Sequence, residues 1–246
     1  KICEKRTIIA TVCNVHNIYR KRVSFIMEQK EKILRGEAAL VLAVIINSLG
    51  VLLMLQSGSG ISAISSVPYA FQQVFPKLTL GTWTYLFQGL LICILMIMRK
   101  KFVPSYLFSF VVRFAFGEMM DLHELWITRL PLNIPLRILY FVLSYIIICF
   151  GIALSNRCKL PIIPTDLFPR EVSEITKVPY ARIKIGFDVT CLVITACMTF
   201  FCLGHIMGLG IGTIVAAFTM GKGIAIIGNW MDRHVGFVSF LQKDEA

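Results

Sequence analysis

Ionisable side chains interrupt long runs of apolar residues at several points of the chain. Arg113 and Glu118 fall within one run, Lys222 falls within another, and Asp188 lies nearer the end of a third. In a bilayer each such charge costs roughly 2.5–3.5 kcal/mol on insertion scales, so charged residues inside spans indicate functional sites. Arg113 has Glu118 and Asp121 as alternative partners. The chemistry indicated is the binding and exchange of a charged solute or a proton.

Glu118 and Lys222 occupy corresponding positions in two similar stretches of sequence. The first stretch, FVVRFAFGE, ends with Gly117 and Glu118, and the second, IGTIVAAFTMGK, ends with Gly221 and Lys222. A carboxylate and an ammonium group can pair there if the two helices touch, and can exchange partners with a charged solute or a proton. Two other interpretations stay open: a static pair that fixes helix register, or two side chains that extend to the membrane surface.

Four further polar residues lie at positions where a solute path is expected. Asp166 follows a Pro-Thr pair and begins an expected short helix, as either an N-cap or a ligand for a solute or cation. Ser65 occupies the matching place in the first half of the chain. A helix N-terminus pointing inward there would favour an anionic group. Gln88 and Asp188 lie at similar depths of their spans, where they either line a path or form hydrogen bonds between helices.

The positions of these residues repeat along the chain. Gly50 corresponds to Gly151 and Ser65 to Asp166, each 101 residues later, and a proline follows three residues after each member of the second pair. Self-similarity at a long fixed offset indicates two structural repeats that build one object. Each half is expected to hold three spans, an odd number, so the second half enters the membrane upside down. Inverted repeats with short helices at matching positions are the recurring plan of secondary transporters.

The composition requires a membrane environment for these runs. Of the 246 residues, 57% are hydrophobic and 16% are charged; a soluble domain carries roughly 25% charged residues. Mean hydropathy is +0.75. Several runs approach the roughly 20 residues needed to cross a bilayer. We therefore expect an all-α, polytopic membrane protein.

The charge and cysteine patterns narrow the class further. The formal net charge is +11, but the basic residues cluster at the ends of apolar runs, which indicates membrane orientation rather than nucleic-acid binding. The eight cysteines include no CxxC pair, and five of them fall in expected membrane helices. Cysteine behaves there as a small hydrophobe, so we expect neither a metal site nor a disulfide framework, and no cofactor.

Six spans and two shorter, half-inserted helices are expected. The spans cover residues 37–56, 80–98, 102–120, 134–154, 185–203 and 209–230; one short helix covers 62–75, and the other begins at Asp166. The resulting division is a basic cytoplasmic segment (1–36), a first membrane repeat (37–121), an external loop (122–133), a second membrane repeat (134–230) and a cytoplasmic tail (231–246). Residues 1–26 are either an extension without a fold of its own or a basic arm that touches anionic lipid.

Lysine and arginine counts give the orientation. With the N-terminus inside, the inside segments hold 20 of these residues and the outside loops hold three. The positive-inside rule therefore places both termini in the cytoplasm.

Short motifs connect the chain to a known group. They are the connector LPIIPTDLF, the Gly-Thr-Trp opening at Gly81 and the stretch from Gly212 to Lys222. On these residues the sequence resembles the YczE/YyaS/YitT family of bacterial integral membrane proteins over residues 38–235. The resemblance implies a six-span protein of the bacterial inner membrane with a transporter-like architecture. It implies no substrate.

Together these patterns favour a secondary transporter or exporter of a small solute, for which an anion is one candidate. The alternative is a non-transporting membrane scaffold or assembly factor for a partner protein. An enzyme is not expected, because the sequence has no Walker loop, no HExxH motif and no spacing typical of a catalytic triad. The expected partners are the lipid bilayer and an unknown small solute, with no nucleic acid; self-association stays open.

Overall fold

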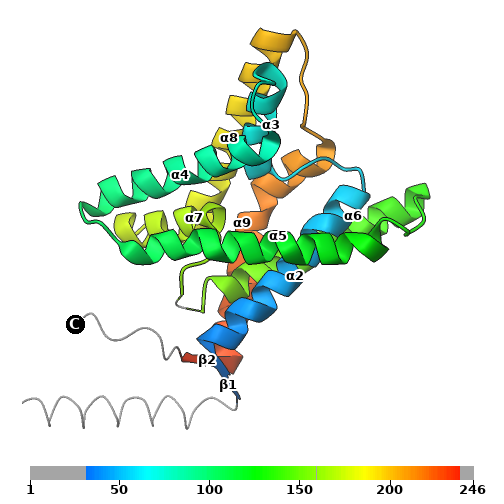
Figure 1. Ribbon diagram of the computed structural model, residues 1–246. Coiled ribbons are helices and arrows are strands. Elements are labelled where there is room, and N and C mark those ends of the chain that lie inside the picture. Colours follow the sequence, from blue (N-terminus) through cyan, green and yellow to red (C-terminus); the bar gives the residue numbers. More distant parts are fainter. Residues whose placement is uncertain (1–31, 159, 239–246) are drawn as a thin grey trace, which may run out of the picture.

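The described part of the chain is mostly helical, which confirms the all-α prediction. The computed structural model describes residues 32–158 and 160–238 (Figure 1). The expectations for residues 1–31 and 239–246 lie outside this part. The helices are α2 (Gly36–Gln56), α3 (Ala63–Val74), α4 (Leu80–Arg99), the 3-10 helix η1 (Pro104–Leu107), α5 (Phe108–Ile127), α6 (Ile134–Ser155), α7 (Pro164–Thr176), α8 (Tyr180–Leu203) and α9 (Ile211–His234).

Five helices are long and apolar enough to cross a membrane, so the chain is a multi-pass membrane protein. They are α2, α4, α6, α8 and α9. The sequence predicted a sixth span at residues 102–120. There the structure has η1 and then α5, which begins at Phe108 and carries four charged side chains: Arg113, Glu118, Asp121 and Glu124. Because of these charged residues, α5 is not among the five helices that are apolar enough to cross a membrane.

Two element boundaries differ from the sequence expectation for physical reasons. α5 continues to Ile127, so the first half of the expected external loop at 122–133 is helical. Leu122 and Leu125 continue its apolar pattern, and no helix breaker occurs before Pro131. α8 begins at Tyr180, five residues before the expected span, because Pro179 fits the position before a helix and polar residues such as Lys184 do not stop one.

α2 and α6 pack against each other, and both contribute residues to the largest apolar core cluster. Two glycines allow this close approach. A Cβ on Gly50 would lie 2.7 Å from Cγ1 of Ile148, and a Cβ on Gly151 would lie 2.2 Å from Oδ1 of Asn47. Small residues at a membrane helix crossing let the two backbones pack closely.

The short helices α3 and α7 each pack against a long helix of the other half. α3 lies alongside α8, where the hydroxyl oxygens of Ser66 and Thr195 are 2.8 Å apart, and α7 lies against α4 and α5 (Figure 1). α5 packs on α2, and α9 packs on α6. Each half of the chain therefore contributes a short helix to the other half.

Two short strands join the ends of the described chain. β1 (Lys32–Arg35) and β2 (Val235–Val238) pair in parallel, with Lys32 opposite Val235. This pairing is not predicted from the sequence. It places the beginning of α2 next to the end of α9 (Figure 1).

Large apolar side chains remain exposed along the helices. They include Ile97 on α4, Phe114 on α5, Phe201 on α8 and Ile226 on α9, each more than 60% exposed. A soluble monomer rarely exposes contiguous apolar surface on this scale. These faces are suited to lipid contact.

Candidate functional site

A cavity of about 330 Å³ lies between the two halves of the chain. Every α-helix from α2 to α9 contributes at least one residue to its lining. The lining is mostly apolar, and its charged or amide side chains are Asn47, Gln88, Arg113, Asp166, Lys184 and Asp188. A concave, largely apolar site with a few polar groups is the usual form of a small-molecule site.

Lys184 and Asp188 form a buried ion pair on the cavity wall. Nζ of Lys184 donates to both carboxylate oxygens of Asp188, at 2.6 and 2.7 Å. The two residues are one helical turn apart on α8, and each side chain is only 3% exposed. They begin a buried polar stripe that continues through Thr195 and Thr199, so this face of α8 points inward. Each charge of the pair compensates the other, whereas either one buried alone would cost much free energy.

Asp166 is the second carboxylate of the cavity, and it has no such partner. It lies in the first turn of α7, whose N-cap is Ile163, so the N-cap interpretation of Asp166 is wrong. Its side chain accepts no hydrogen bond from any residue in the described part of the chain. Burial raises the pKa of the Asp166 carboxyl to about 6; the ammonium group of Lys184 opposes this shift, and the carboxylate of Asp188 adds to it.

Arg113 and Gln88 add polar groups that form no ion pair or hydrogen bond within the described residues. The Arg113 guanidinium carbon lies 5.7 Å from the ring centroid of Phe116 on its own helix. Within residues 32–158 and 160–238 it forms no ion pair with Glu118 or Asp121. Gln88 is almost completely buried on α4, and its Oε1 has no hydrogen-bond partner in this same region.

The structure does not bring Glu118 and Lys222 to the cavity. Both side chains are exposed, and no ion pair joins them in the described structure. α5 turns Val112 and Phe116 inward, which places Glu118 on another face of the helix. The inward stripe of α9 is formed by residues such as Met220, and Lys222 lies off that stripe. By contrast, Ser65 contributes to the cavity lining together with Gln88, Arg113, Asp166 and Asp188.

Lys184 is a cavity residue that was not predicted from the sequence. It lies one residue before the expected span at residues 185–203, because hydropathy places the start of that span at Ile185. The available signal was the spacing of Lys184 and Asp188, since residues four apart lie on one helix face and can pair.

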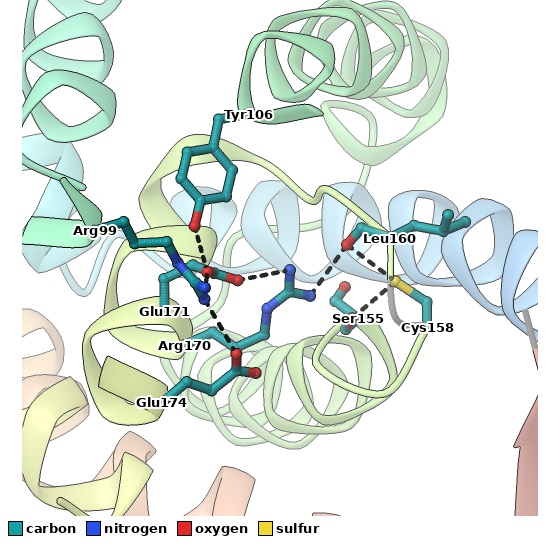
Figure 2. Close-up of polar contacts among 8 residues, drawn as sticks. All are labelled: Arg99, Tyr106, Ser155, Cys158, Leu160, Arg170, Glu171 and Glu174. Atoms are coloured by element: carbon teal, nitrogen blue, oxygen red, sulfur yellow. Dashed lines mark hydrogen bonds and ion pairs between the residues drawn. The ribbon is translucent and has the colours of Figure 1, made fainter. Parts of the chain in front are cut away.

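A second polar cluster holds α7 in place beside the cavity (Figure 2). Glu171 of α7 is 7% exposed and accepts from Arg99 at the end of α4. It also accepts from the hydroxyl of Tyr106 of η1 at 2.5 Å and from Nη2 of Arg170 at 3.4 Å. Arg99 makes a further contact with Glu174, 3.4 Å away. One carboxylate thus joins three elements.

This cluster also fixes the connector before α7. Nη1 of Arg170 donates to the carbonyl oxygen of Leu160 at 3.1 Å, and the thiol of Cys158 contacts the carbonyl of Ser155 at 2.9 Å (Figure 2). Burial, followed by the bond to Glu171, raises the pKa of the Tyr106 phenol far above its ordinary range. Tyr106 therefore stays a neutral donor. The cluster attaches the helix that carries Asp166 to α4 and η1.

The comparisons with known proteins give a family. DUF6198, a family of unknown function, matches residues 34–229, and the chain belongs to it. No curated protein and no solved structure matches the chain.

Proposed function

We propose that this member of DUF6198 is a secondary transporter or exporter of a small charged solute, with an anion as the first candidate. The observation that supports this most is the cavity, where a buried ion pair and an unpaired carboxylate lie between the two halves of a membrane protein. Polar residues at membrane depth are expensive and therefore indicate ion or solute paths.

The two halves are proposed to be inverted repeats. Two packing contacts at the α2–α6 crossing support this. Gly50 packs on Ile148, and Gly151 packs on Asn47. Both residues of the second half lie 101 positions after the corresponding residues of the first half, with the partners exchanged. A pseudo-two-fold axis between two repeats produces such exchanged pairs.

Six crossings are proposed, with α5 as the sixth. The pairing of β1 and β2 brings the start of α2 to the end of α9, so both belong at one membrane surface. Five crossings would separate those ends, whereas an even number keeps them together. α5 has 20 residues and is therefore about 30 Å long, which matches the hydrocarbon core. Of its four charged residues, Arg113 faces the cavity, where a charge is tolerated, whereas Glu118, Asp121 and Glu124 are exposed.

The location is proposed to be the bacterial inner membrane, with both termini in the cytoplasm. The distribution of lysine and arginine supports the orientation. The resemblance of the connector around Asp166 and of the stretch from Gly212 to Lys222 to the YczE/YyaS/YitT family supports the bacterial membrane and the transporter-like plan. α3 and α7, with 12 and 13 residues, are proposed to be half-inserted helices.

The proposed function is tested by comparing metabolites in cells and in spent medium. Three strains would carry the wild type, the double variant Lys184→Met/Asp188→Leu, and Lys222→Met, all at matched abundance in the membrane. We expect one solute class to shift across the membrane with the wild type and with Lys222→Met, because Lys222 lies off the cavity. The double variant, which lacks the cavity pair, should show no shift.

The same comparison separates the proposal from its alternative. If the three profiles are identical while all three proteins are folded, the cavity does not move a solute. The chain would then fit a membrane scaffold or assembly factor for a partner protein, with its exposed apolar faces as the docking surface. We propose no enzymatic activity for the cavity.

A further inference from the structure

We propose that Asp166 is the proton-binding residue of this cavity, and that one proton moves together with one monovalent anion. The inference rests on the proposed transport function and adds the coupling ion and the charge of the solute. Three observations support it: the unequal states of the two carboxylates, the charges of the lining, and the groups that act on Asp166.

The two carboxylates of the cavity differ in how they are engaged. Both oxygens of Asp188 accept from Nζ of Lys184. Asp166 accepts no hydrogen bond within the described residues, although it borders the same cavity. A half-buried carboxylate without a donor is disfavoured in its charged form, and taking up a proton removes that cost. Of the two, Asp166 is therefore the one suited to exchange a proton with cavity water.

The charges of the lining then specify the solute. Four charged side chains line the cavity, two cationic (Arg113 and Lys184) and two anionic (Asp166 and Asp188). With Asp166 ionised, the cavity is neutral. With Asp166 protonated, it carries one net positive charge, which one monovalent anion balances. Of the two cations, Arg113 is the one that forms no ion pair within the described residues, and it is suited to such an anion because a guanidinium group binds carboxylates and similar oxyanions through paired hydrogen bonds.

The environment of Asp166 keeps its proton exchangeable at ordinary pH. The charged and titratable groups that act on it are Lys184, Asp188 and Tyr180 from α8 and Arg170 on α7 itself, and Arg113 from α5 lines the same cavity. Arg170 is engaged by Glu171, and Lys184 by Asp188. The cations therefore only partly offset the burial of Asp166, whose pKa is raised to about 6.

The cycle balances in protons and charge. On one side of the membrane, Asp166 takes a proton from cavity water, and the anion binds beside Arg113. After the cavity changes sides, the anion leaves, and the carboxyl returns its proton to water there. The empty cavity is neutral when it returns. One proton and one monovalent anion thus cross together, and no net charge is moved.

The test is infrared spectroscopy of the full-length protein in liposomes at stepped pH. It follows the C=O stretch of a protonated carboxyl group and requires no solute. We expect a band that appears as pH falls, with a midpoint near pH 6. Asp166→Asn should abolish it, Asp166→Glu should retain a titrating band, and Glu118→Gln, which changes an exposed carboxylate, should leave it unchanged.

Stability provides a second readout with a defined sign. The folded protein holds the Asp166 proton more tightly than the unfolded chain, because the folded-state pKa is raised. The stability contributed by this proton is therefore present at low pH and declines as pH rises toward about 6. Asp166→Asn should lack this part of the decline in melting temperature.

The outcomes separate the inference from the proposed function. The proton site is overturned if the wild-type band persists in folded Asp166→Asn. It is also overturned if no carboxyl band titrates near pH 6. If the band behaves as expected but no solute moves in the metabolite comparison, the transport function fails and the coupling fails with it. If both hold, solute movement in the wild type should increase as the source side is acidified, and Asp166→Asn should abolish that pH dependence.

Discussion

Replacing Lys184 by methionine alone should strongly destabilise the protein. Asp188 would lose both hydrogen bonds to Nζ of Lys184 and the positive charge that compensates it. A carboxylate that is 3% exposed must then either stay ionised without a cation or take up a proton, and breaking a buried pair in this way costs about 3–5 kcal/mol. The measurement is the unfolding midpoint of the purified protein in detergent, together with the fraction that elutes as a single species.

The double variant Lys184→Met/Asp188→Leu is the matched control. Replacing a buried ion pair by apolar residues of similar volume is often neutral or stabilising, because neither charge is then left alone. We therefore expect the double variant to recover most of the stability while still failing to move solute. A single Lys184→Met variant as stable as the wild type would contradict the view that the pair is closed in this state.

Replacing Glu171 by alanine should also lower the stability of the protein strongly, because Glu171 holds α7 rather than the cavity pair. Its carboxylate accepts from Arg99, Arg170 and Tyr106, which come from α4, α7 and η1. Removing it leaves these donors without their common acceptor and detaches α7 from its neighbours. We expect a loss of about 3–5 kcal/mol in the free energy of unfolding, measured by denaturant titration.

Glu174→Ala provides the comparison. Glu174 contacts the same Arg99, but its side chain is 60% exposed, so this pair is a surface salt bridge. Such pairs contribute about 0–1 kcal/mol. If Glu171→Ala and Glu174→Ala lower the free energy of unfolding by equal amounts, the Glu171 cluster does not hold α7.

The long helices could be predicted from the sequence because hydropathy over a span does not depend on tertiary packing. α2, for example, begins within one residue of the predicted start at 37. The short helix α3 was predicted within one residue at each end. The β1–β2 pairing could not be predicted, because it joins four-residue segments at opposite ends of the chain, and strand pairing of this kind leaves no local pattern.

The sequence shows which polar residues lie inside the apolar helices. It does not show which face of the helix each one occupies. Gln88, Arg113 and Asp188 stand out as polar residues inside apolar helices. Glu118 satisfies the same criterion, yet its side chain lies on an outer face, because the inward face of α5 is set by its packing on α2. The Glu171 cluster was missed for a related reason: Arg99 and Glu171 are 72 residues apart and meet only in the folded chain.

The most direct test of the account is whether the cavity is reached from both sides of the membrane. Ser65→Cys places a thiol on the lining, where none of the cysteines in the described residues lies. The measurement is labelling by a small, membrane-impermeant thiol reagent in right-side-out and inside-out vesicles, compared with the unsubstituted protein. Alternating access predicts additional labelling in both vesicle orientations. Labelling from one side only, or from neither, would show a pocket that does not carry solute across the membrane.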